Sequence, residues 1–208
     1  MSNNLLVAVG SKQELRKILG PVSERNINKV RSSLHPVDKD WLNSSPFVFV
    51  ASSGNDGSCD VSPKGDPRGF TKIINDTTIV IPERPGNRRA DSYMNILENP
   101  NVGLFFIIPG RGDALRINGN ATILKDAPFF DDLVAFGHRP SLALKIDIKE
   151  IYFHCSKSFM RANFWNQESW TESTMPERAQ IVHQLKTTNL TLEELKTHYG
   201  SKYKQGLY

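Results

Sequence analysis

The chain has 208 residues, of which 38% are hydrophobic, so it is long enough for one domain of ordinary to large size with its own core. Its formal net charge of +4 is spread out rather than blocked, which argues against a nucleic-acid-binding protein. No apolar run approaches the roughly 18 residues of a membrane span. The N-terminus lacks the pattern of a secretory signal, so we expect a soluble, cytoplasmic protein without a membrane partner.

The N-terminal part of the chain has a helical pattern. Ser11 and Glu14 have the spacing of a capping box, which predicts the start of a first helix. A second helix is expected to begin after Ser23 and to end at Pro36. A further helical turn around Trp41 is expected to pack against the strands that come after it, so this flank reads as a scaffold rather than a site.

The middle of the chain alternates short apolar runs with turn signals. The expected strands lie at residues 47–52, 59–62, 70–74, 77–81, 102–108, 114–124, 142–148 and 150–154. The sequence Asn55-Asp56-Gly57 predicts a hairpin turn between the first two. Pro63 and Gly65 interrupt residues 60–66, where we expect a bulge or loop.

Many strands with little alternation of strand and helix predict a split antiparallel β-barrel with flanking helices, a mainly β (α+β) fold. The expected division is a helical flank at 1–45, the barrel at 46–170 and a helical tail at 171–208, in one compact domain overall. Cys59 and Cys155 lie in strand-like surroundings and are expected to be buried free thiols.

Basic residues follow a turn in the middle of the barrel region. Asn87, Arg88 and Arg89 stand at the start of a short predicted helix, where free backbone N–H groups and guanidinium groups favour a phosphate dianion. Ser62 and Lys64 lie at another strand end, and Arg116 at a third, and in a barrel these ends can face one cleft. The alternative is a loop with two exposed arginines.

No catalytic or metal motif stands out. The five histidines show no metal-ligand spacing, so we predict no metal site, and His154 beside Cys155 reads as a structural histidine at a strand end. There is no G-x-S-x-G, no P-loop and no G-x-G-x-x-G after a strand. Trp165 and Trp170 are open to two readings, the covering of a ring system or core packing.

Four segments carry a resemblance to a known family. They are DVSPKGDPRGF (60–70), IPERPGNRRADSYMNILENPNVGLFFIIPGRG (81–112), LRINGNATI (115–123) and FHCSKSFMRANFW (153–165). Together they resemble the FMN-binding split-barrel family related to pyridoxamine 5'-phosphate oxidase, in a branch of largely unassigned function.

The resemblance implies a homodimer of split barrels with two FMN molecules at the subunit interface. It implies that Ser62 and Lys64 contact the FMN phosphate and ribityl chain, and that the backbone at Ile81 and Pro82 faces the isoalloxazine. The remaining positions that match the family's cofactor site are Asn87, Arg88 and Arg89 on the phosphate, Arg116 reaching across from the partner subunit, and Lys157, Arg161 and Trp165 near the ring.

The chain departs from the true oxidase at three places, one of them the C-terminal segment, where the tryptophan and arginine that the oxidase uses on its substrate do not recur in their usual pattern. The Arg-x-x-x-x-Lys strand signature is missing around Ser62, and Ala114 or Leu115 stands where the oxidase carries a glutamine. We therefore expect an FMN-binding flavoprotein and oxidoreductase of unknown substrate, in which Arg116 or Lys157 stabilises the reduced flavin anion. The alternative is a non-catalytic flavin-binding or redox-sensing module.

Overall fold

The computed structural model describes residues 6–170, 175–200, 203 and 207–208. The chain forms two compact units, Met1–Val30 and Arg31–Tyr208. Within the described ranges, no helix is long and apolar enough to cross a membrane. The boundaries predicted at residues 45 and 170 stay predictions.

The first unit carries helices α1 (Lys12–Leu19) and α2 (Glu24–Asn28). Helix α1 begins as predicted, because the Ser11 hydroxyl accepts a hydrogen bond of 3.1 Å from the Glu14 backbone N–H. The prediction that the second helix runs to Pro36 is wrong. Helix α2 lacks a side-chain cap bond and has five residues, too few for an isolated helix to be stable in water.

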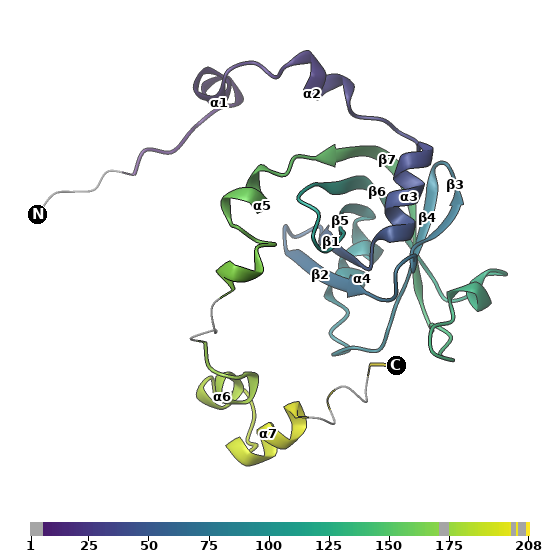
Figure 1. Cartoon of the computed structure of the whole chain (residues 1–208), viewed down its shortest axis with the longest axis vertical. Coiled ribbons are helices and arrows are strands. Elements are labelled where there is room, and N and C mark those ends of the chain that lie inside the picture. The colour runs from purple at the N-terminus through teal and green to yellow at the C-terminus, as the bar shows by residue number, and fades with distance from the viewer. Residues whose placement is uncertain (1–5, 171–174, 201–202, 204–206) are drawn as a thin grey trace, which may run out of the picture. The chain divides into compact units, whose positions relative to one another are not determined.

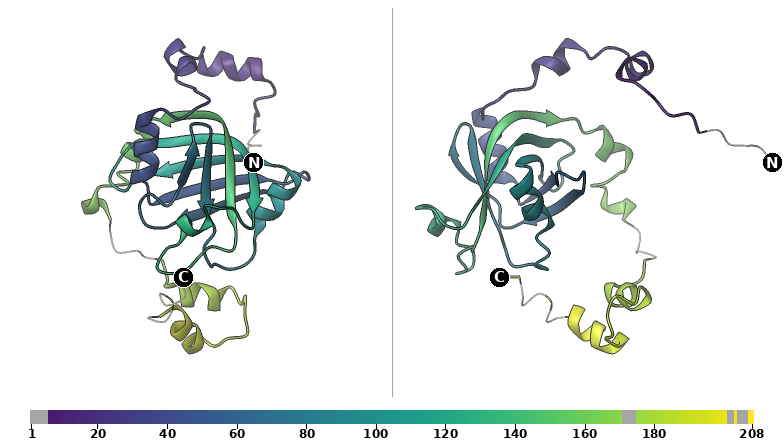
Figure 2. Two further views of the ribbon diagram at one scale, coloured as in Figure 1. Left: turned by 90° about the vertical axis from the view of Figure 1, so that its right-hand side faces the viewer. Right: turned by 180° about the vertical axis from the view of Figure 1, so that it is seen from behind.

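The second unit is built on one antiparallel sheet of seven strands (Figure 1). The strands are β1 (Phe47–Ser53), β2 (Cys59–Gly65), β3 (Lys72–Asn75), β4 (Thr78–Pro82), β5 (Asn101–Ile107), β6 (Ala114–Leu124) and β7 (Ala143–His154). Their order in the sheet is β2-β1-β5-β6-β7-β4-β3. The sheet curls into the predicted split barrel with flanking helices, as the two views of Figure 2 show.

Helices follow or interrupt the strands of the second unit. They are α3 (Pro36–Ser44), α4 (Asp91–Glu98), α5 (Lys157–Arg161), α6 (Arg178–Gln184) and α7 (Leu192–Tyr199), with 3-10 turns η1 (Phe130–Leu133) and η2 (Gln167–Ser169). Pro36 opens α3 instead of ending a helix, which suits a residue that has no N–H to donate. Trp41 of α3 is buried in the core, as its predicted packing requires.

Two strand predictions need correction. Residues 60–66 were expected to form a bulge or loop, but β2 is a continuous strand that pairs with β1 in regular register. It is an edge strand, so Pro63 can be accommodated where a central strand would lose a ladder hydrogen bond. The two strands expected at 142–148 and 150–154 are one strand, β7, paired along β6 with an irregularity between Asn118 and Gly119.

Gly119 is required at that irregularity. A Cβ atom at this position would lie 2.3 Å from the backbone oxygen of Asp147 on β7, far closer than non-bonded atoms approach. The absence of a side chain therefore lets β6 and β7 stay paired where the register shifts.

The core lies on the concave face of the sheet. Inward-facing residues of the central strands are almost fully buried, including Val48, Val50, Leu104, Phe106, Leu115 and Ile117. The prediction for the cysteines is wrong: Cys59 and Cys155 are free but exposed, since both stand at a strand end rather than in a strand interior.

Candidate functional site

The loop Asn87–Arg89 leads directly into α4. The Asn87 side-chain oxygen accepts a hydrogen bond of 3.0 Å from the Arg89 backbone N–H, and Arg88 and Ala90 adopt left-handed backbone conformations with φ of 61° and 58°. Ala90 is the N-cap and has no side chain that could satisfy the first N–H groups of α4. These N–H groups and the conformations before them have the character of an anion-binding turn.

The two arginines of this loop are exposed to solvent. Arg89 is 72% exposed in its side chain and pairs with Asp91 through a contact of 2.7 Å. An exposed pair of this kind contributes little to stability, so Arg89 can change partner at low cost. Within the described residues, no side-chain partner is recorded for Arg88. The loop therefore offers two available guanidinium groups beside free backbone donors.

A second polar group lies under α4, on the inner side of β2. The Lys64 ammonium contacts a Glu83 carboxylate oxygen at 2.5 Å, and the Tyr93 hydroxyl donates to the same oxygen at 2.6 Å. The ammonium also lies 5.2 Å from the centre of the Tyr93 ring. One carboxylate thus joins the end of β2, the residue after β4 and the first turn of α4. We call Lys64, Glu83 and Tyr93 the polar triad.

Burial and charge fix the protonation of Tyr93. Loss of solvent around the phenol, followed by the negative charge of Glu83 and the hydrogen bond to it, raises the pKa of Tyr93 far above its ordinary value. Tyr93 therefore remains a neutral donor at any physiological pH and holds the Glu83 carboxylate in place.

The other residues at this end of the barrel differ in burial and in pairing. Ser92 of α4 donates to the Asp60 carboxylate of β2. Ile81 and Pro82 are buried as whole residues and pair with Leu144 and Ala143 of β7. Ser62 stands opposite buried Val50 in the β1–β2 register, on the same inward side as Lys64.

Arg116 does not join this group within one chain. It lies on β6, where its neighbours Leu115 and Ile117 point into the core and Arg116 points to the opposite, outer side of the sheet. Its guanidinium lies 5.6 Å from the centre of the Tyr152 ring, and its Nε donates to Asn118 at 3.4 Å. Arg116 also lines a shallow outer depression of about 480 Å³.

The C-terminal candidates lie on and after α5. Lys157 and Arg161 are exposed and belong to this five-residue helix. Trp165 packs against Phe159 and Phe164, with ring centres 6.1 Å and 4.8 Å apart. Its indole N–H is buried and has no hydrogen-bond partner recorded within the described residues. Trp165 therefore belongs to a small aromatic cluster in the single chain.

Sequence reasoning missed Glu83 and Tyr93. Two signals could have indicated them: Glu83 directly follows a strand end already singled out, and Tyr93 lies in the first turn of the helix that follows Arg88 and Arg89. The pairing of Glu83 with Lys64 could not be read from the sequence, because 19 residues separate the two.

Comparisons with known proteins give distant structural similarities. A solved structure of HupZ from Group A Streptococcus is 20% identical, with 57% of this chain and 91% of that chain covered and a TM-score of 0.46. A putative pyridoxamine 5'-phosphate oxidase from Lactobacillus delbrueckii is 19% identical, with 59% of this chain and 95% of that chain covered and a TM-score of 0.46. An FMN-binding protein from Syntrophomonas wolfei is 15% identical, with 68% of this chain and 92% of that chain covered and a TM-score of 0.42.

A search of curated proteins finds no match to this chain. The family model described as pyridoxamine 5'-phosphate oxidase matches residues 34–155, more than half of the sequence. The matched range contains the whole antiparallel sheet, the Asn87–Arg89 loop and the polar triad. The chain is therefore a member of the pyridoxamine 5'-phosphate oxidase family.

Proposed function

We propose that the protein binds FMN and works as an FMN-dependent oxidoreductase. The observation that carries the proposal is the pair Arg88 and Arg89 at the uncapped start of α4. Two exposed guanidinium groups beside free N–H donors suit a phosphate dianion. Ser62 on the inner side of β2 would add a hydroxyl for the phosphate or ribityl chain.

The polar triad modifies the role expected of Lys64. The Lys64 ammonium already forms an ion pair with the Glu83 carboxylate, so its charge is balanced without a phosphate. In our proposal Arg88 and Arg89 supply the positive charge for the phosphate, and Lys64 contributes to it only if it leaves Glu83. The contact between the ring system and the backbone of Ile81 and Pro82 stays a prediction, because both residues are buried within the single chain.

A homodimer would complete this site. The outer side of the sheet carries a largely apolar row that runs from β2 to β7, through Pro63, Phe49, Phe105, Arg116 and Tyr152. Phe49 is 36% exposed, and Val61 beside this row is 62% exposed. Such an exposed apolar surface marks an interaction site. In the proposed dimer it is the subunit interface, and Arg116 reaches the cofactor of the partner subunit.

Bound FMN would supply the electron acceptor and donor of the reaction, and the protein would orient it and exclude water. Arg116 or Lys157 would favour the reduced, anionic flavin by its positive charge. The alternative, a flavin-binding module without turnover, differs in one observable: whether a substrate or only air reoxidises the reduced flavin. The cytoplasmic location also stays a prediction.

The first experiment is a visible absorption spectrum of the purified protein, with mass analysis of any compound released on denaturation. The Arg88→Ala/Arg89→Ala double variant should then bind FMN roughly 10- to 1000-fold more weakly, through loss of charge-assisted hydrogen bonds. The matched control is Arg16→Ala/Lys17→Ala, which removes two adjacent cations from α1 and should leave the affinity unchanged. Equal FMN affinity in both double variants would contradict the assignment of the Asn87–Arg89 loop.

A further inference from the structure

Two ion pairs of opposite direction join the end of β2 to the segment that follows β4. Lys64 pairs with Glu83 at 2.5 Å, and Asp66, two residues further along the chain, pairs with Arg84 at 2.6 Å. The strands β2 and β4 are not neighbours in the sheet, since β1, β5, β6 and β7 stand between them in its order. Side chains rather than a strand ladder therefore hold the two segments together at this point. We call Lys64, Asp66, Glu83 and Arg84 the charge clasp.

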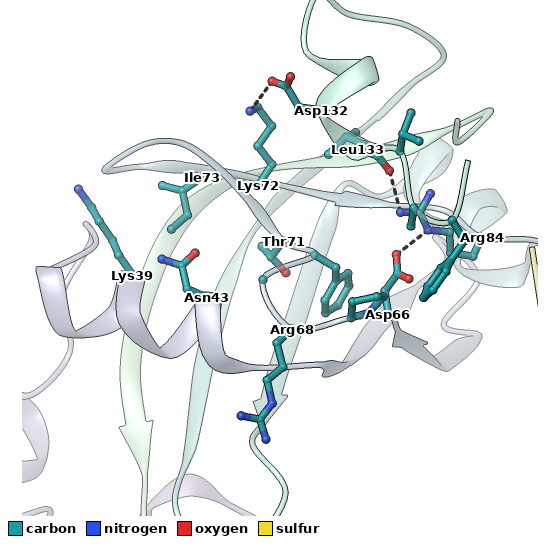
Figure 3. Close-up of a pocket in the computed structure, with 16 residues that line it drawn as sticks. Lys39, Asn43, Asp66, Arg68, Thr71, Lys72, Ile73, Arg84, Asp132 and Leu133 are labelled. Carbon is teal, nitrogen blue, oxygen red and sulfur yellow. Dashed lines mark hydrogen bonds and ion pairs between the residues drawn. The ribbon is translucent and has the colours of Figure 1, made fainter. Parts of the chain in front are cut away.

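The pair of Asp66 and Arg84 is buried, with side chains that are 1% and 14% exposed. Arg84 also donates to the Leu133 carbonyl at 2.7 Å, and the Tyr208 hydroxyl donates to the second carboxylate oxygen of Asp66 at 2.6 Å. Figure 3 shows this pair at the wall of a cavity of about 660 Å³ between α3 and two further segments of the chain. The pair holds its place firmly, because separating it would leave an unpaired charge away from water.

The other pair closes the loop that carries the two exposed arginines. The Glu83 carboxylate, held by Lys64, accepts a hydrogen bond of 2.6 Å from the Tyr93 hydroxyl. Glu83 stands before this loop and Tyr93 stands after it, in the first turn of α4, so their contact joins the two ends of the loop. The Ser92 hydroxyl adds a second connection between α4 and β2 through Asp60. The loop is therefore fixed at its beginning and at its end.

The backbone between these ends is in a conformation that needs support. Arg88 and Ala90 have φ of 61° and 58°, in the left-handed region that residues with a side chain rarely adopt. Such conformations persist where surrounding contacts over-determine them. The contacts within the loop, from the Asn87 side chain to the Arg89 backbone and from Arg89 to Asp91, are exposed to solvent. Much of the constraint on the loop therefore comes from its fixed ends.

We propose that the charge clasp positions the Asn87–Arg89 loop, so that Arg88 and Arg89 are in place before a phosphate binds. The inference rests on the proposed flavin function, and it makes Tyr93 a positioning residue that acts through Glu83 rather than on the ligand. Because the loop would contact only the phosphate, the clasp determines the preference for FMN over riboflavin, which lacks that group. A clasp that only stabilised the fold would affect both flavins equally.

The test titrates the full chain with FMN and with riboflavin, follows the quenching of flavin fluorescence, and compares the two dissociation constants as a ratio. Tyr93→Phe keeps the ring and removes only the hydroxyl, so the preference for FMN should fall by about 3- to 10-fold. Asp66→Asn/Arg84→Gln removes both charges of the buried pair together and should lower the preference by about 5- to 30-fold. Tyr199→Phe, which removes a phenol hydroxyl from α7, is the matched control and should leave the ratio unchanged.

A second measurement needs no flavin. Hydrogen exchange of the backbone amides at residues 86–90 should be about 3- to 10-fold faster in Tyr93→Phe than in the unmodified protein, whereas the turn at residues 110–113 should exchange at the same rate in both. If the unmodified protein binds no FMN but its loop responds in this way, the proposed function fails and the positioning role stands. Equal losses of affinity for FMN and riboflavin in Tyr93→Phe, or unchanged exchange of the loop amides, would overturn the positioning role.

Discussion

The two sides of the same strands differ in what covers them. On the inner side, Val50, Leu104 and Ile117 lie opposite one another across β1, β5 and β6, and each is at most 1% exposed. On the outer side, Phe49 and Phe105 also lie opposite one another, but Phe49 is 36% exposed. The inner row is covered by other parts of the chain. The outer row also contains apolar residues, but among the described residues Phe49 stays partly exposed to solvent.

This contrast shows that apolar residues in a strand do not by themselves indicate which side of the sheet faces the core. A strand with one solvent-exposed side alternates apolar and polar residues, as antiparallel strands commonly do. Strand β1, with Phe47, Val48, Phe49 and Val50, is apolar on both sides. We infer that this sheet has two surfaces to bury, one within the chain and one against a second copy. Substitutions on the inner side should therefore change the folding equilibrium, and substitutions on the outer side should change the equilibrium of the proposed dimer.

The largest effect is expected on the inner side. Ile117→Ala removes a side chain that is 0% exposed and should lower the free energy of unfolding by about 2–5 kcal/mol. Asn118→Ala, the adjacent outward position, should cost less than about 1.5 kcal/mol through its hydrogen bond to Glu150. Urea unfolding followed by circular dichroism measures both. Equal losses in the two variants would remove the distinction between the sides.

An intermediate effect is expected on the outer side. Phe49→Lys should raise the dimer dissociation constant by about 10- to 100-fold, because it places a charge in the apolar row. Val37→Lys is the matched control, since Val37 is an exposed apolar residue of α3 outside that row. Analytical ultracentrifugation across a concentration series gives the dissociation constants. If the unmodified protein is monomeric at all concentrations, the proposed interface is contradicted.

The smallest effect at neutral pH concerns the polar triad, where charge replaces apolar packing on the inner side of the barrel. Tyr93→Phe should lower the free energy of unfolding by about 1 kcal/mol through its lost hydrogen bond. The pKa of Tyr93 is raised in the folded state, so its contribution is complete below about pH 10 and declines above it.

The slope of that decline is about 1.4 kcal/mol per pH unit for one proton. The stability difference between the unmodified protein and Tyr93→Phe should therefore shrink as the pH rises from about 10 to about 11. Urea unfolding at several alkaline pH values tests this. Parallel pH curves for the two proteins would mean that Tyr93 titrates normally in the folded state.

Much of the fold could be predicted from the sequence, because local patterns fix it. The hairpin at Asn55–Gly57, the β6 bounds and the α3 turn were predicted from turn residues and apolar runs and are confirmed. The continuous strand β2 was not predicted, since the effect of Pro63 depends on whether a strand lies at an edge of the sheet. That position is a property of the whole topology and not of the seven residues concerned.

The candidate site divides in the same way. The Asn87–Arg89 loop could be located from its turn residues and the helix after it, and the structure does place it at the start of α4. The link between Lys64 and Glu83 and the outward direction of Arg116 depend on strand pairing between distant segments. The cavity beside Arg84 depends on three separate segments and left no local signal.

The sequence of β2 also bears on how copies of the chain can associate. An unpaired strand edge is a template for pairing with another chain, and aggregation begins there in many proteins. Here the middle of the β2 edge carries Pro63, which has no N–H to offer, followed by Lys64, whose charge points inward. Both features discourage a further strand from adding to β2. The same segment that contributes to the candidate site thus makes the addition of a further strand at this edge unfavourable.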